Sequence, residues 1–115
     1  MTGHRGENYF VDFDPVQGRE QAGVRPALVL SVDLLNRLPL VVTVVPGTDG
    51  ANVRRNFPST VRMSPGEIGL PLETVFLCFQ IRALDLSRFA ARPAGRLGPT
   101  AMARVERSIR YCLGV

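Results

Sequence analysis

The residue types that usually perform catalysis are sparse in this chain, and their absence narrows the chemistry. The single histidine, His4, excludes a ribonuclease site built on two histidines and a Ser-His-Asp triad. The two cysteines, Cys78 and Cys112, have no histidines at zinc-binding spacing, and without lysine there is no phosphate-binding loop of the glycine-rich, lysine-ending kind. Any catalysis must therefore rest on Arg, Glu, Ser, Thr or Tyr. That set suits phosphoryl transfer, where charge placed around the reacting phosphate supplies most of the rate.

Arginine supplies all the formal positive charge of the chain. Fourteen arginines against ten acidic residues give a net charge of +4, and the isoelectric point is about 10. Planar guanidinium groups match phosphate oxygens in pairs, so this charge favours an anionic partner such as nucleic acid. The carboxylates are scattered and show no spacing that demands a metal ion. We therefore expect neither a metal nor another cofactor.

The elements that must position these residues are mostly strands. Aromatic and β-branched residues predict strands over 7–13, 26–31, 40–45, 59–63 and 74–79, the last continuing or pairing through 80–84. Polar, glycine-containing loops are expected over 16–25 and 47–56, with Pro46-Gly47 ending the strand before the second loop. After Gly98-Pro99, apolar residues recur at helical spacing and predict a C-terminal helix, with its arginines facing away from the apolar side.

About six short strands and one terminal helix predict a mainly β fold, a small, twisted and partly open barrel. A length of 115 residues suits one domain, spanning residues 1–115. No apolar segment approaches the roughly 18–20 residues that cross a bilayer, and the N-terminus lacks the apolar core of a signal peptide. We therefore expect a cytoplasmic protein without a membrane partner, with Cys78 as a small core residue.

The segment from Arg5 to Ser31 resembles the N-terminal signature of the MazF/PemK toxins. Its matching positions include Arg5-Gly6, Asp12, Pro15, Gly18, Glu20-Gln21, Gly23 and Arg25-Pro26. Further blocks of that family match in order downstream, at Asn36-Arg37, Pro46-Gly47-Thr48, Gln80–Arg88 and Arg96-Leu97-Gly98. The resemblance therefore spans essentially the whole chain.

Similarity to this family implies a fold, an activity and partners. The fold would be an SH3-like, partly open barrel of the MazF/PemK/CcdB type with a C-terminal helix, assembled as a two-fold homodimer. The activity would be metal-independent cleavage of single-stranded RNA, including mRNA, at preferred sequences through attack of a 2′-hydroxyl on the adjacent phosphorus. The chain would be the toxin of a toxin–antitoxin pair that inhibits translation and growth. Its partner would be a cognate antitoxin of the MazE type with an acidic, disordered tail.

Three residues are candidate catalytic groups. The resemblance implies that Arg25 and Thr48 are the catalytic pair and that Glu20 contacts RNA. By its chemistry, Arg25 suits stabilisation of a dianionic phosphorane, and Thr48 suits hydrogen-bond donation to a non-bridging oxygen. Glu20 suits the general-base role better than Arg25 does, provided its site raises its pKa toward neutrality. Simpler interpretations stay open, since Arg25 could pair with a carboxylate such as Asp12 and Thr48 could be a turn residue.

The other candidates would contact RNA without reacting, and they are Arg19, Gln21, Arg54, Arg55 and Gln80. For the two adjacent loop arginines among them, a plain solvated loop is an alternative. The chain departs from the usual family pattern on either side of Thr48, at Gly47 and Asp49, and just before Gln80, at Phe79. These departures bear on substrate preference more than on the reaction.

Two other functions compete with RNA cleavage. CcdB-type gyrase poisons resemble this fold and use a C-terminal Trp-Gly-Ile contact, whereas this chain has no tryptophan and ends Leu113-Gly114-Val115. A homologue that binds RNA or DNA without cutting it would keep the basic surface and lose the reaction.

Overall fold

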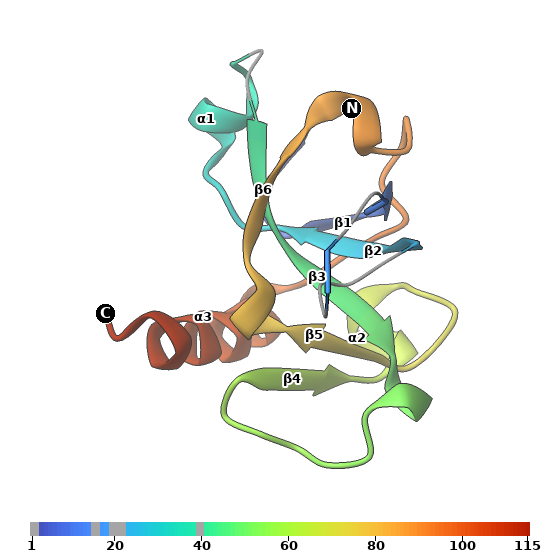
Figure 1. Ribbon diagram of the computed structural model, residues 1–115, viewed down its shortest axis with the longest axis vertical. Coiled ribbons are helices and arrows are strands. Elements are labelled where there is room, and N and C mark those ends of the chain that lie inside the picture. The colour runs from blue at the N-terminus through green and yellow to red at the C-terminus, as the bar shows by residue number, and fades with distance from the viewer. Residues whose placement is uncertain (1–2, 15–16, 19–22, 39–40) are drawn as a thin grey trace.

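The computed structural model describes residues 3–14, 17–18, 23–38 and 41–115 (Figure 1). The strands are β1 (Glu7–Asp12), β2 (Val24–Val29), β3 (Val41–Asp49), β4 (Thr60–Met63), β5 (Thr74–Leu77), β6 (Arg82–Asp85) and β7 (Gly95–Arg96). The helices are α1 (Asp33–Asn36), α2 (Pro65–Ile68) and α3 (Pro99–Leu113), and the 3-10 turns are η1 (Gly50–Asn52), η2 (Cys78–Gln80) and η3 (Leu86–Arg88).

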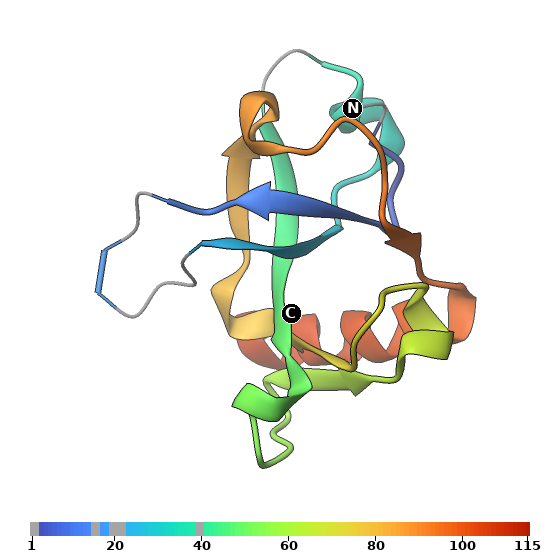
Figure 2. The same cartoon turned by 90° about the vertical axis from the view of Figure 1, so that its right-hand side faces the viewer.

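The long strand β3 organises an antiparallel sheet in the order β4-β5-β3-β2-β1-β7, with β6 also pairing to β3. One edge of β3 pairs with β2, from Val44 to Pro46. Its other edge is divided, since Val41 to Val44 pair with β6 and Gly47 to Asp49 pair with β5. Because one strand serves three neighbours over its length, the sheet curls around it (Figures 1 and 2).

The segment that follows β6 crosses to the outer edge of β1 and partly closes the curl. Val11 forms a bridge with Phe89, and the backbone N–H of Ala90 donates to the carbonyl of Phe10 at 2.9 Å. Next, β7 pairs with Glu7 and Asn8 at the start of β1. The predicted mainly β, partly open barrel with a C-terminal helix is confirmed.

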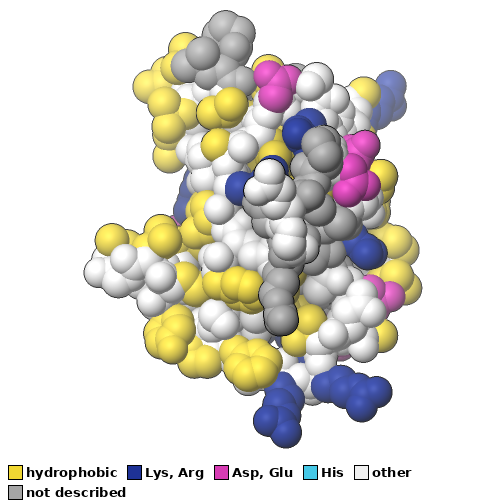
Figure 3. Space-filling view, viewed as in Figure 1, with side chains coloured by type: hydrophobic (Ala, Val, Ile, Leu, Met, Phe, Trp, Pro, Cys, Tyr) yellow, Lys and Arg dark blue, Asp and Glu magenta, His cyan; other side chains and the backbone are white. Residues whose placement is uncertain are grey.

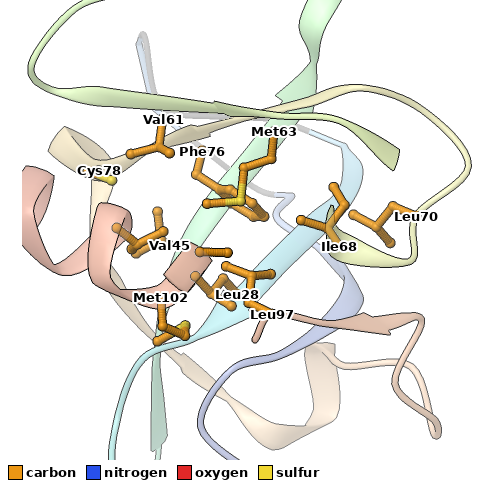
Figure 4. Close-up of a cluster of buried hydrophobic side chains, with 12 residues drawn as sticks. Leu28, Val45, Val61, Met63, Ile68, Leu70, Phe76, Cys78, Leu97 and Met102 are labelled. Atoms are coloured by element: carbon orange, nitrogen blue, oxygen red, sulfur yellow. The ribbon is translucent and has the colours of Figure 1, made fainter. Parts of the chain in front are cut away.

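Two hydrophobic cores lie on the two faces of this sheet. The concave core fills the curl and consists of Tyr9, Val11, Phe13, Ala27, Val29, Val42, Val44 and Leu84. The second core lies between the other face of the sheet, β4, β5 and α3, and includes Leu28, Val45, Met63, Ile68, Phe76, Cys78 and Met102 (Figure 4). Strand alternation explains the division, since successive residues of β2 and β3 point to opposite cores.

The prediction that Pro46-Gly47 ends a strand is wrong, because β3 continues to Asp49. Pro46 pairs with Ala27, and Gly47 pairs with Phe76 of β5. A Cβ at Gly47 would lie 2.7 Å from Cγ2 of Thr74, so only glycine lets β3 and β5 approach this closely. Strand β2 likewise begins at Val24, before the predicted start at 26.

The C-terminal helix α3 confirms its predicted position and ends at Gly114, whose φ of 71° lies in the left-handed region. One arginine departs from the prediction that the helix arginines face solvent. Arg104 is half-buried and donates to the Glu67 carboxylate at 3.1 Å and to the Arg62 carbonyl at 2.8 Å. It does so because α2 and β4 lie alongside the helix. Within the part of the chain that is described, no helix is long and apolar enough to cross a membrane.

Candidate active site

The register of β2 and β3 directs Arg25 and Thr48 to the same face of the sheet. The pairing of these strands runs from Val29–Val44 to Ala27–Pro46, and Arg25 and Thr48 each lie two residues beyond the last pair. Residues two apart on a strand present their side chains on the same face. Alternation from Val29 and Val44 assigns that face to the concave core. Two residues 23 positions apart in sequence therefore share one end of the concave face.

The backbone around Arg25 argues against an ion pair between this residue and Asp12. On β1, Val11 pairs with Arg25 while Asp12 pairs with Val24, so Asp12 and Arg25 point to opposite faces. The Asp12 carboxylate accepts the backbone N–H of Asp14 at 3.0 Å. Beside the half-buried Arg25 is a cavity of about 160 Å³, which is also lined by Phe10, Val24, Pro26, Asp49, Leu70, Pro71, Leu72 and Thr74.

Thr48 is a strand residue and not a turn residue. It lies in β3 opposite Val75, is only 5% exposed, and its Oγ1 accepts a hydrogen bond from Nδ2 of Asn52 at 3.1 Å. Asn52 belongs to η1, and the Asp49 carboxylate caps that turn by accepting the Ala51 N–H at 2.9 Å. The departure from the family pattern at Asp49 therefore has a structural role, because it forms the turn that holds Asn52 on Thr48. Sequence reasoning missed Asn52, which is one polar residue in a polar loop.

Gln80 and Arg82 stand at the start of β6. Gln80 is the last residue of η2 and is half-buried. Arg82 pairs with Val44, so it lies on the concave face, and its guanidinium carbon is 5.6 Å from the centroid of the Phe13 ring. Sequence reasoning did not single out Arg82, although its alternation with Leu84, a concave-core residue, was a usable signal.

The structure does not bring all the predicted RNA-binding residues to this face. Arg54 and Arg55 are exposed in the loop between η1 and β4, where basic side chains protrude at the bottom of Figure 3. Within the described ranges neither forms a hydrogen bond or an ion pair. Arg19, Glu20 and Gln21 lie outside the described residues.

The acidic groups with shifted pKa values have structural partners. The backbone N–H of Arg5 lowers the pKa of Asp33, the backbone N–H of Ser64 lowers that of Glu67, and hydrogen bonds from Ser87 lower that of Asp85. Burial raises the pKa of the Cys78 thiol to about 11, which confirms a core role for that residue. Among the described residues, no three His, Cys, Asp or Glu side chains are grouped closely enough to hold a metal ion.

Known proteins resemble this chain over most of its length. A family model described as the PemK-like, MazF-like toxin of type II toxin–antitoxin systems matches residues 4–113. The chain is a member of this toxin family. The matched segment includes β2 and β3, and therefore both Arg25 and Thr48.

Relatives within the family are similar over their full lengths. Endoribonuclease MazF of Staphylococcus epidermidis is 34% identical over 96% of this chain and 91% of that protein. Endoribonuclease EndoA of Bacillus subtilis is 32% identical over 100% and 97%. The crystal structure of MazF from Deinococcus radiodurans aligns with a TM-score of 0.83 at 28% identity, over 100% of this chain and 99% of that one. A mycobacterial endoribonuclease solved in complex with its cognate antitoxin aligns with a TM-score of 0.77 at 25% identity, over 97% and 95%.

Proposed function

We propose that this MazF-like toxin is a metal-independent endoribonuclease that cuts single-stranded RNA, mRNA included, at preferred sequences. The observation that supports the proposal is the β2–β3 register, which ends at Ala27–Pro46 and, by alternation along both strands, directs Arg25 and Thr48 to one face. A planar cation and a hydroxyl donor are the groups needed around a phosphodiester attacked by its own 2′-hydroxyl. The products are a 2′,3′-cyclic phosphate and a free 5′-hydroxyl.

Arg25 stabilises the negative charge that grows on the phosphorane. Its guanidinium offers parallel N–H donors that match two equatorial oxygens. The general-base role is assigned to Glu20 and not to Arg25, because a guanidinium acts through its charge and its N–H donors. It remains suited to electrostatic stabilisation and to proton donation toward the leaving oxygen.

Thr48 donates its hydroxyl hydrogen to a non-bridging oxygen of the same phosphate. Because its Oγ1 already accepts the Asn52 amide, the O–H is free to be the donor toward substrate. A hydroxyl held in this orientation needs no reorganisation as charge develops, and removing one such donor typically costs about 2.7–4 kcal/mol of transition-state stabilisation. Asn52 thus acts through Thr48 as a positioning residue.

The family pattern supports RNA contact at Glu20, Gln21 and Gln80, and the remaining roles are proposed from charge and chemistry. Glu20 is the proposed general base toward the 2′-hydroxyl. The proposed RNA contacts are Arg19, Gln21, Gln80, Arg54 and Arg55. Gln80 adjoins the concave face through η2, and the two exposed loop arginines attract phosphate without fixing a base.

A homodimer buries apolar surface that a single chain leaves exposed. Phe79, Tyr111 and Leu113 are 56%, 64% and 59% exposed, and with Ile81 and Cys112 they line a groove of about 390 Å³. Exposed apolar patches of this kind are typical of protein interfaces. Sedimentation equilibrium at micromolar concentration should report two chains, and a stable monomer would contradict this assembly.

The second partner is a cognate antitoxin of the MazE type, as in the mycobacterial complex. A basic cleft that accepts RNA also accepts an acidic, disordered tail that folds on binding. With residues 1–115 acting as one domain, the toxin works in the cytoplasm, where mRNA and antitoxin are both present.

The decisive comparison uses Arg25→Ala, Thr48→Ala and wild-type protein on mixed-sequence single-stranded RNA in excess EDTA. Wild-type protein should give discrete fragments with cyclic phosphate ends, and Arg25→Ala should lose more than nine-tenths of the turnover while keeping RNA binding. An Arg25→Ala variant that retains more than a tenth of the turnover would remove Arg25 from the mechanism. Intact RNA together with trapped gyrase complexes would support a gyrase poison, and intact bound RNA would support a non-cleaving binder.

A further inference from the structure

Arg82 has hydrogen-bonding capacity that the folded chain does not use. Among the described residues its guanidinium forms no hydrogen bond and no ion pair, and Nη1 is buried without a partner. The guanidinium carbon of Arg82 lies over the face of the Phe13 ring, 5.6 Å from the ring centroid. Charged donors that are buried are normally paired, so an unpaired guanidinium nitrogen carries a cost to the free protein.

The position of Arg82 connects it to the Arg25–Thr48 pair. Val44 pairs with Arg82 on one side and with Val29 on the other, which assigns all three to the concave face. From there the side chain of Arg82 reaches Phe13, which follows β1 and donates its backbone N–H to the Gly23 carbonyl at 3.0 Å. Phe13 is therefore next to the β1–β2 pair formed by Val11 and Arg25. The guanidinium of Arg82 therefore lies against Phe13, the residue that continues β1 beyond the pair formed by Val11 and Arg25.

We propose that Arg82 binds a phosphate of the RNA strand in the cleft, beside the phosphate held by Arg25. The inference rests on the proposed ribonuclease function and adds a residue to it. A ring face attracts a cation without accepting its in-plane N–H groups, so the contact with Phe13 leaves those donors unused. A rotation of the Arg82 side chain that exposes the buried Nη1 would bring them to phosphate oxygens. A polyanion bound along this face would gain a favourable electrostatic contact from each guanidinium that it reaches.

A purely structural role for Arg82 makes the opposite prediction about stability. If the contact with Phe13 were its purpose, removing the guanidinium would lower the melting temperature. If Arg82 instead serves to bind RNA, replacing it with an apolar residue of similar length should leave the melting temperature unchanged or raise it, because the substitution removes an unpaired charge. Arg82→Met tests this, since methionine keeps most of the apolar stem.

The experiment measures binding of a single-stranded RNA that carries 2′-deoxyribose at the cut site, over a range of salt concentrations, together with thermal unfolding. Arg82→Met should weaken binding roughly ten- to hundredfold and reduce the slope of log K against log salt by about 0.7, the loss of one phosphate contact. Arg82→Lys should recover part of the affinity and keep the salt slope. The matched control is Arg107→Met on α3, an exposed arginine without a hydrogen bond or ion pair to any described residue, which should bind within twofold of wild type.

The outcomes separate this inference from the function on which it rests. Wild-type cleavage combined with an Arg82→Met variant that binds within twofold of wild type would overturn the role of Arg82 and leave the ribonuclease function standing. A lower melting temperature with unchanged binding would assign Arg82 to the fold. A wild-type chain that neither binds nor cuts RNA would overturn both.

Discussion

The side-chain amide of Asn8 is a buried polar group whose cost to the stability of the fold can be measured by substitution. Asn8 lies in β1 between Leu28 of β2 and Gly95 of β7, and it has no solvent exposure. Both Oδ1 and Nδ2 of its side chain are buried and have no hydrogen-bond partner among the described residues. The protein thus buries a fully desolvated amide at a position where an apolar side chain would have no hydrogen bonds to lose.

Asn8→Val should therefore stabilise the protein. A buried polar group without a partner costs about 1–3 kcal/mol, and valine both removes this cost and suits a strand. Valine removes the two terminal atoms of the amide and adds a second γ carbon, which the surrounding side chains must accommodate. With an unfolding entropy of about 2.1 cal/mol/K per residue, a 115-residue chain gains about 4 °C per kcal/mol, or about 4–12 °C in all.

Asn36→Val is the matched control, because Asn36 is equally buried but fully engaged. Its Oδ1 accepts the hydroxyl of Ser31, and its Nδ2 donates to the carbonyl of Ser31 at 2.8 Å. Losing these bonds should lower the melting temperature, so the two substitutions should have opposite signs in calorimetry. A fall in melting temperature for Asn8→Val would refute the reasoning, because it would mean that the amide is satisfied in solution.

Three further predictions concern a thiol, a carboxyl and a glycine. Iodoacetamide at pH 8 should label Cys112 well before Cys78, because a pKa of about 11 leaves Cys78 about a hundredfold less thiolate than the ordinary 9.0; equal labelling in peptide maps would be inconsistent with its burial. Glu67→Gln should flatten the acid side of the stability profile. The pKa of Glu67 is lowered from 4.5, so its contribution is present above that value and is lost as pH falls through the lowered pKa; unchanged urea-unfolding curves between pH 7 and pH 3 would count against this. Gly47→Val should destabilise by about 1–3 kcal/mol through overpacking against Thr74, and a variant that melts with the wild type would show that β3 can shift.

Sequence patterns anticipated the elements with the clearest composition. β1, β2 and β3 were predicted from runs of aromatic, β-branched and apolar residues, and α3 from apolar residues that recur at helical spacing. The continuation of β3 through Pro46-Gly47 was not, since these residues end strands by local preference. Here pairing with β2 on one side and β5 on the other outweighs that preference.

The site was predictable to the extent that a family pattern marks it. Arg25 and Thr48 came from the resemblance, while the register that opposes them appears only in the folded sheet. Other matched residues are structural. Gly6 has a φ of 94°, and Arg5 donates to the Leu30 carbonyl and to the Glu106 carboxylate, both at 2.9 Å, which ties the N-terminal segment to α3. A match to the family motif therefore does not show by itself whether a residue is catalytic or structural.

The central claim is that this chain cuts RNA through the 2′-hydroxyl next to the scissile phosphate, with Arg25 stabilising the charge. The most direct measurement maps the cut in an RNA substrate and then replaces the ribose at that single position with 2′-deoxyribose. The account predicts that cleavage of that bond stops while the modified RNA still binds. Continued cleavage at the modified position would contradict it, because no internal nucleophile would remain there.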